Sequence, residues 1–201
     1  DEADAFLSTV CEGPAVVKAD GLAAGKGVIM TTSKPEAILA VKSMLDGALG
    51  DAGKKVVLEE TLTGPELSVF AFVDGETVSA EVAACDYKRI GDGDEGPNTG
   101  GMGAYTPPEF WSPELAARIR TEILQPTARG MVAEGRPYRG FLYAGLMVTD
   151  DGPKVIEFNC RMGDPEGGVV LPTLQSDLLE TCMAVAEGRL RENDVSWDGS
   201  S

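Results

Sequence analysis

The chain has 201 residues, 43% of them hydrophobic and 25% charged, a composition typical of a soluble globular protein and unlike a disordered or membrane-spanning one. Its 17 Lys and Arg against 33 Asp and Glu give a net charge of −16, which disfavours nucleic acids and anionic membranes as partners. The chain contains no histidine, which excludes Ser-His-Asp catalysis and histidine-ligated metals, and its four cysteines are too scattered for a disulfide framework. An acidic N-terminal stretch and the lack of a bilayer-length apolar run lead us to expect a cytoplasmic protein.

The first predicted element is a strand that runs into a small-residue loop, Val16 to Val28. Lys18 ends the strand, and Lys26 lies in the loop among three glycines, Gly21, Gly25 and Gly27. Glycines let backbone amides approach oxygen atoms and two ammonium groups neutralise charge, so the pattern predicts a polyphosphate site. It is not a P-loop, because the glycine spacing is too short and no Ser or Thr follows the lysine. A hairpin with surface lysines is the alternative.

A helix and an antiparallel hairpin are predicted next. Ser33 to Glu36 has the form of a capping box, and Ile38, Val41, Leu45 and Ala48 follow at helical spacing, which predicts a helix of about four turns. A short strand over 56–59 follows. The strand 67–73 is then expected to pair with 77–84 through the turn signal Asp74-Gly75.

The segment 85–110 is rich in glycine and proline and is predicted to be a long functional loop. Its Gly91 to Gly96 stretch matches G-x-G-x-x-G, but three carboxylates and a following proline argue against a dinucleotide site. A calcium loop is excluded as well, because the twelfth position is Gly103 rather than a glutamate. The stretch Pro97 to Tyr105 has the neutral amides and glycines that suit contact with a small polar substrate.

The C-terminal half reads as helix, hairpin and helix. A helix opens at Ser112, with Pro126 expected to kink or interrupt it before Gly135. A hairpin over 141–149 and 154–159 and a last helix from about 176 to 188 follow. Together the elements predict an α+β chain of two lobes, 1–62 and 63–201, each with an antiparallel sheet covered on one face by helix and with the active groove between them.

A candidate metal site lies on the last predicted strand. Glu157 and Asn159 are two residues apart, so both oxygen-bearing side chains leave the same face of the sheet and could share a hard cation. Ile156 and Phe158 would then point into the core. Arg161 follows at once and could meet an anion, while Asp164 and Glu166 add acceptors in the next turn.

Four stretches carry a resemblance to a known family: Lys18 to Val28, Pro97 to Tyr105, Gly140 to Leu146 and Ile156 to Arg161. In this order along nearly the whole chain they resemble the phosphoribosylamine–glycine ligases of the ATP-grasp superfamily. The resemblance implies a nucleotide clamped between two lobes, with the loop from Leu22 to Gly27 closing over the phosphates. The abrupt start and end of the chain also lead us to expect that flanking N- and C-terminal domains of the full enzyme are absent.

The resemblance also assigns roles to individual residues. The implied catalytic residues are Lys18, Lys88 and Arg161. The nucleotide would be bound by Lys18, Gly25, Lys26, Gly27, Glu59, Glu60, Leu62 and Glu66, of which Glu60 and Leu62 would act through their backbones and Glu66 near the ribose. The substrates would be bound by Asp86, Lys88, Asn98, Thr99, Gly100, Arg161 and Asp164. The metal ligands would be Glu157 and Asn159.

The implied activity is an ATP-dependent carbon–nitrogen ligation in purine biosynthesis. It would join glycine to 5-phosphoribosylamine through a glycyl phosphate, with ATP and Mg²⁺ or Mn²⁺ as cofactors and small molecules plus the flanking domains as partners. Without those domains, we expect this chain to bind nucleotide without efficient ligation. Two alternatives stay open: another ATP-grasp carboxylate–amine ligase, and a non-catalytic nucleotide-binding module.

Overall fold

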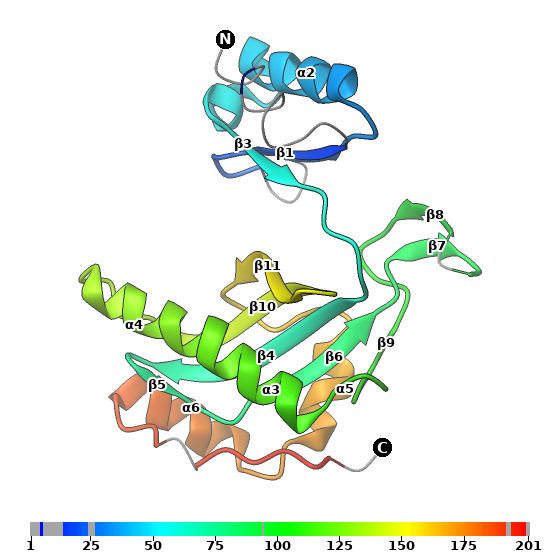
Figure 1. Cartoon of the computed structure of the whole chain (residues 1–201). Coiled ribbons are helices and arrows are strands. Elements are labelled where there is room, and N and C mark those ends of the chain that lie inside the picture. Colours follow the sequence, from blue (N-terminus) through cyan, green and yellow to red (C-terminus); the bar gives the residue numbers. More distant parts are fainter. Residues whose placement is uncertain (1–4, 6–13, 24–26, 94, 192–193, 200–201) are drawn as a thin grey trace. The chain divides into compact units, whose positions relative to one another are not determined.

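A computed structural model describes residues 5, 14–23, 27–93, 95–191 and 194–199, and Figure 1 shows the arrangement of the elements within each part of the chain. The chain divides into two compact units, Asp1–Leu62 and Thr63–Ser201. Each unit is built on an antiparallel sheet. The expected α+β class is therefore confirmed.

The first unit is a three-stranded sheet with a helix on one face. The strands are β1 Ala15–Ala19, β2 Val28–Met30 and β3 Val56–Glu60, with β1 in the centre. Alternation along β1 directs Ala15 and Val17 towards helix α2, Lys34–Ser43, where they are fully buried. The opposite face of β1 therefore presents Val16 and Lys18.

Helix α2 is shorter than the four turns that the spacing predicts. It passes into a π-helical turn, Met44–Ala48, and ends there because Gly47 has a φ of +99°; a 3₁₀ helix, Gly50–Lys54, follows. The buried residues of this segment are Ala37, Ala40, Val41 and Met44, whereas Leu45 and Ala48 are exposed. The helical spacing of Ile38, Val41, Leu45 and Ala48 therefore does not continue to the end of the segment as one buried face, because Met44 occupies the core-facing position.

The second unit has a central sheet of order β11-β10-β4-β6-β9, with β5 pairing the far end of β4. The strands are β4 Glu66–Asp74, β5 Thr77–Val78, β6 Val82–Asp86, β9 Ala104–Tyr105, β10 Arg139–Thr149 and β11 Gly152–Asn159. The two predicted hairpins are confirmed, although Ser79 to Glu81 interrupt the first one between β5 and β6.

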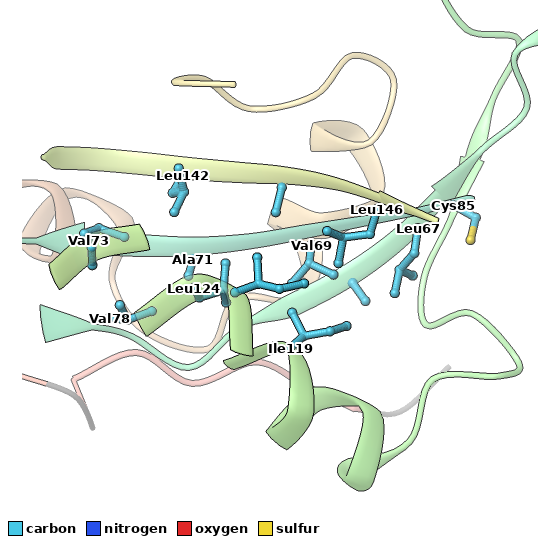
Figure 2. Packing of buried hydrophobic residues seen from close by; sticks show 14 residues of the cluster. Leu67, Val69, Ala71, Val73, Val78, Cys85, Ile119, Leu124, Leu142 and Leu146 are labelled. Carbon is cyan, nitrogen blue, oxygen red and sulfur yellow. The ribbon is translucent and has the colours of Figure 1, made fainter. Parts of the chain in front are cut away.

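Helices cover both faces of this sheet, where the sequence predicted one covered face. On one face, helices α3 Pro113–Ile119 and α4 Gln125–Ala133 bury Leu67, Val69 and Leu146, as Figure 2 shows. On the other face, α5 Gly167–Val170 and α6 Leu178–Glu187 pack against the aromatic side chains Phe70 and Phe72. The reason lies in β4, which is apolar at almost every position and buried on both sides.

Local capping and turn chemistry explain the helix boundaries. Ser112 accepts a hydrogen bond from the Leu115 backbone amide at the start of α3, and Gly188 ends α6 in the left-handed conformation. Pro126 does not break the α3–α4 helix. A π-helical turn, Arg120–Leu124, precedes it, so the missing proline donor is accommodated by a local change in hydrogen bonding.

The segment 85–110 is more regular than the long loop predicted from its composition. The strands β7 Arg89–Gly91 and β8 Glu95–Asn98 form a hairpin across the G-x-G-x-x-G stretch, and β9 joins the main sheet. That stretch therefore opens no helix, in agreement with the rejection of a dinucleotide site. No helix among the described residues has the length and apolar character needed to cross a membrane.

Candidate functional site

The first unit carries a lysine on the sheet face that α2 leaves uncovered. Lys18 lies near the end of the central strand and forms an ion pair with Glu59 of β3, with 2.6 Å between Nζ and Oε2. The Lys18 side chain is only 18% exposed. Because the sheet holds its stem, the ammonium group has a fixed position from which it can meet an anion.

Apolar side chains surround this lysine. The strand register pairs Lys18 with Val28 and Val57, so the three side chains share one face, and Met30 lies on the same face through its pairing with Val16. Val28, Met30 and Val57 are exposed although they are large and apolar. A face of this kind suits a ligand that combines a flat, weakly polar group with an anionic one.

The glycine-rich loop is described only in part. Gly25 and Lys26 lie outside the described residues. Gly21 packs so closely on Ala52 that a Cβ atom would lie 2.6 Å from the Ala52 Cα, and its amide donates to the Ala52 carbonyl. Gly27 accepts a hydrogen bond from the Ala19 amide. Gly21 and Gly27 therefore make backbone contacts within the first unit.

The last residues of the first unit were expected to act mainly through their backbones. Glu60 is the register partner of Ala15, so its side chain lies on the same sheet face as α2, and the Glu59 side chain lies on the opposite face. Leu62 is half-buried and ends the unit. Between them, the buried hydroxyl of Thr61 has no hydrogen-bond partner among the described residues.

In the second unit, polar residues gather at one end of the face that α5 and α6 cover. Along β4 this face changes from Phe72 and Phe70 to Ser68 and finally to the exposed Glu66. Lys88 makes a short ion pair with Glu66 and lies 3.8 Å from Asp86. Three of the predicted binding residues thus meet, on β4, at the end of β6 and just beyond it.

The charges in this group perturb one another. Burial raises the pKa of Asp86, the charge of Lys88 opposes that rise, and Glu166 and Glu66 add to it. Burial acts to lower the pKa of Lys88, but the hydrogen bond and charge of Glu66, together with Asp86 and Glu157, outweigh it and raise the pKa. Lys88 therefore stays a cation across the physiological range.

Glu157 and Asn159 lie side by side on β11, next to this group. Asn159 Nδ2 donates to Glu157 Oε1 at 2.9 Å, as expected for residues two apart on one strand. In the part of the chain that the structure describes, no cluster of three or more His, Cys, Asp or Glu side chains could hold a metal ion. Phe158 is 42% exposed, so its expected place in the core is wrong; β11 is an edge strand.

Three buried polar residues complete the cluster; the sequence indicated Glu166 as an acceptor in the turn after Arg161, but it did not single out Ser68 or Tyr143. Glu166 accepts hydrogen bonds from Tyr143 (2.9 Å) and Ser68 (3.1 Å), and those two hydroxyl groups lie 2.8 Å apart. Burial, together with the charge of Glu166, raises the pKa of the Tyr143 phenol. Tyr143 therefore remains a neutral donor. The available signal was the presence of two hydroxyls within otherwise apolar strands.

The glycine-rich stretch after β8 packs against this part of the sheet. Thr99 donates its backbone amide and its hydroxyl to the Lys88 carbonyl, and that hydroxyl accepts from the Gly101 amide. A Cβ at Gly101 would lie less than 3.0 Å from Pro165. Thr99 therefore shapes the loop, whereas Gly100 is exposed, with no atom within 4 Å of its Cβ position. Asn98 is paired with Arg89 through the strand register.

Arg161 and Asp164 lie on the surface beyond β11. Arg161 donates to the Met162 carbonyl at 2.9 Å, and both side chains are exposed. Among the described residues, no ion pair or side-chain hydrogen bond joins Arg161 or Asp164 to Lys88 or Glu157. A separate cavity of about 450 Å³ beside α6 has none of the predicted site residues in its lining.

The two α+β units, each built on an antiparallel sheet, form an ATP-grasp protein, and solved structures show the same fold. The phosphoribosylamine–glycine ligase of Thermotoga maritima has a TM-score of 0.82 at 37% identity, over 98% of this chain and 50% of that one. The biotin carboxylase domain of Hydrogenobacter thermophilus 2-oxoglutarate carboxylase has a TM-score of 0.68 at 18% identity, over 98% of this chain and 42% of that one, and shows the fold alone.

The chain belongs to the phosphoribosylglycinamide synthetase family, whose ATP-grasp (A) domain matches residues 1–167. It is 54% identical over 187 residues to the phosphoribosylamine–glycine ligase of Vibrio vulnificus, covering 92% of this chain and 44% of that protein. The enzyme of Xanthomonas axonopodis is 53% identical over 201 residues, covering 98% and 47%. The chain thus spans less than half the length of these curated relatives.

Proposed function

We propose that this chain is the ATP-binding part of a ligase that joins glycine to 5-phosphoribosylamine with cleavage of ATP, a step of purine biosynthesis. The observation that carries the proposal is the convergence of Glu66, Asp86, Lys88 and Glu157 around one end of the second sheet. The names of the relatives supply the substrates. We include in the proposal further domains of the complete enzyme and a cytoplasmic location.

Lys18 would bind the phosphate groups of the nucleotide, and the apolar face around it would hold the base. The ammonium already has Glu59 as a partner at 2.6 Å, so an incoming phosphate competes with a carboxylate for it. The pairing with Glu59 offsets the desolvation of the lysine before a nucleotide binds, because the ammonium then has a counter-charge. Val28, Val57 and Met30 would lose exposed apolar area on binding.

The acidic cluster would take a divalent cation together with the nucleotide phosphates. Three carboxylates, Glu66, Asp86 and Glu157, act on the single ammonium of Lys88, so the cluster is net negative and would repel a free polyphosphate. Glu157 and Asn159 offer the hard oxygen donors that Mg²⁺ and Mn²⁺ take, and phosphate and water oxygens would complete the shell. A bound cation would neutralise phosphate charge during transfer.

The reaction that we propose asks the protein mainly to position charged groups. The carboxylate of glycine attacks the γ-phosphorus of ATP, ADP leaves, and a glycyl phosphate forms. The amine of phosphoribosylamine then attacks the glycyl carbonyl, and phosphate leaves as the amide bond closes. Lys88 would hold its positive charge beside the transferred phosphoryl group, and positioning of this kind suffices for phosphoryl transfer.

Calorimetric titration of the chain with ATP in Mg²⁺ tests the proposal. We expect Lys18→Met and Glu157→Gln each to weaken binding by about tenfold or more, equivalent to about 1.4 kcal/mol or more. Lys54→Met is the matched control, since Lys54 is an exposed lysine of the same unit paired with Asp51. Unchanged affinity in both test variants, or an equal loss in the control, would contradict the proposed site.

A second measurement addresses the chemistry. Phosphate release should depend on glycine and not on alanine when the complete enzyme carries this chain, and Lys88→Met should reduce it without unfolding the second unit. Nucleotide binding with no turnover in the complete enzyme would instead favour the non-catalytic nucleotide-binding module. Release with other acceptors would favour a different carboxylate–amine ligase.

A further inference from the structure

A carboxylate is buried in the second unit without a cation beside it. Glu166 is 3% exposed, and the described residues offer it no ion pair; its partners are the hydroxyls of Ser68 and Tyr143. Both partners are buried as well. Burying an ionised carboxylate costs several kcal/mol unless hydrogen bonds offset it, so packing alone does not explain an acid at this position.

The two hydroxyls stand next to the strand that carries the candidate metal ligands. Tyr143 is the register partner of Asn159 across β10 and β11. Ser68 pairs with Gly145, which in turn pairs with Glu157. Gly145 has no side chain, and a Cβ there would lie 3.3 Å from Glu157 Cγ. Glu166 is thus hydrogen-bonded to the sheet at the residue opposite Asn159 and at a residue one strand further from Glu157.

Glu166 also fixes the loop that returns from β11. A Cβ at Gly163 would lie 2.5 Å from Glu166 Oε2, so the loop backbone passes directly over the carboxylate. The Gly167 amide donates to the Gly163 carbonyl at 2.9 Å and closes the turn. The neighbouring Pro165 contacts the glycine-rich stretch at Gly101. The buried Glu166 carboxylate therefore contacts the loop after β11 directly and the glycine-rich stretch through Pro165.

We propose that Glu166 is a positioning residue that ties the loop 160–166 and the glycine-rich stretch 97–103 to the strand bearing Glu157 and Asn159. The inference rests on the proposed function in one respect, namely that these loops meet phosphate and substrate. The claim that Glu166 holds the two loops against the sheet does not depend on a ligand. Glu166 itself is shielded from solvent by its own loop, so it acts through the groups that it holds.

The energetics separate this role from a general contribution to stability. Replacing Glu166 by Met removes the acceptor and the buried charge but keeps an unbranched chain of similar length. Ser68 and Tyr143 can still hydrogen-bond each other across 2.8 Å, so neither hydroxyl is orphaned. Replacing buried charges by apolar groups is often neutral or stabilising. A positioning role therefore predicts looser loops in a protein whose overall stability is kept.

Hydrogen exchange of backbone amides, followed by mass spectrometry without nucleotide, tests the inference. In Glu166→Met we expect exchange in 97–103 and 160–166 to rise about tenfold, while β4 and α6 and the urea midpoint stay unchanged. Glu166→Gln keeps an acceptor oxygen at the Oε1 position and should retain most of the protection. Glu76→Met, at an exposed turn of the same unit, is the control and should change neither loop.

The double variant Ser68→Ala/Tyr143→Phe removes both donors without altering residue 166 and should loosen the same two loops. If Glu166→Met does not fold, the exchange of the two loops in this double variant tests the inference in its place. Unchanged exchange in both loops in either variant, or faster exchange throughout the unit with a lower urea midpoint in Glu166→Met, would overturn the positioning role. Failure of the wild-type protein to bind nucleotide would contradict the proposed function, but it would not affect the conclusion drawn from the hydrogen exchange of the two loops.

Discussion

The contact between the glycine-rich stretch and the Pro165 turn gives the sharpest prediction, which concerns Gly101→Ala. Gly101 has a φ of +124°, and its Cβ position lies less than 3.0 Å from Pro165 Cδ. An alanine held in that conformation costs about 1 to 3 kcal/mol, and overpacking adds about 1 to 3 kcal/mol. Staying in place would therefore cost about 2 to 6 kcal/mol.

Opening the loop is the competing response. It would break the hydrogen bond from the Gly101 amide to Thr99 and the one from the Met102 amide to the Tyr87 carbonyl, at about 0.5 to 1.5 kcal/mol each. That sum is smaller than most of the strain range, so the loop should lift from Pro165 while the core stays folded. We expect a loss of about 1 to 3 kcal/mol in the free energy of unfolding.

Urea unfolding and hydrogen exchange over 97–103 measure the two consequences. Gly100→Ala is a matched control one residue away, because no atom lies within 4 Å of its Cβ position and its φ is not in the left-handed range. The control should stay within about 0.5 kcal/mol of wild type. Equal stability and equal exchange in Gly101→Ala and Gly100→Ala would refute the close packing on Pro165.

Three further outcomes are expected from the structure. Burial raises the pKa of Tyr105 from 10.0 to about 12, so its contribution to stability is complete below pH 10 and is lost as the pH rises towards 12; Tyr105→Phe should flatten that alkaline loss in urea titrations. Leu124→Ala, in a fully buried position, should cost about 2 to 5 kcal/mol by urea unfolding, whereas Leu39→Ala at an exposed position should cost little. Asp177→Ala removes the acceptor for the Glu180 amide at the start of α6 and should lower the melting temperature in proportion to about 1 kcal/mol; an unchanged value would show that this cap is dispensable.

Elements with local signals were predictable from sequence. The hairpin of β10 and β11 follows from alternation around the turn before Gly152, and α6 follows from its cap residue and from Gly188. The β7–β8 hairpin was missed because its strands are three and four residues long and hold glycine and proline instead of β-forming residues. The second helical layer, formed by α5 and α6, was missed. Periodicity shows which residues are apolar, but it does not show whether helices cover one face of the sheet or both.

The candidate site likewise contains residues with a local sequence signal and residues that only long-range strand pairing brings together. Glu157 and Asn159 were predictable because two residues on one strand share a face whatever the rest of the chain does. Glu166 was predictable only as an acceptor in a polar loop; its burial and its contacts were not, because its partner Ser68 lies 98 positions away. Its burial is decided by the register of three strands and by the absence of a side chain at Gly163. If that register were shifted by one residue, Ser68 and Tyr143 would turn to the opposite face, so the pairing of β4, β10 and β11 determines the buried contacts as well as the face that carries Glu157 and Asn159.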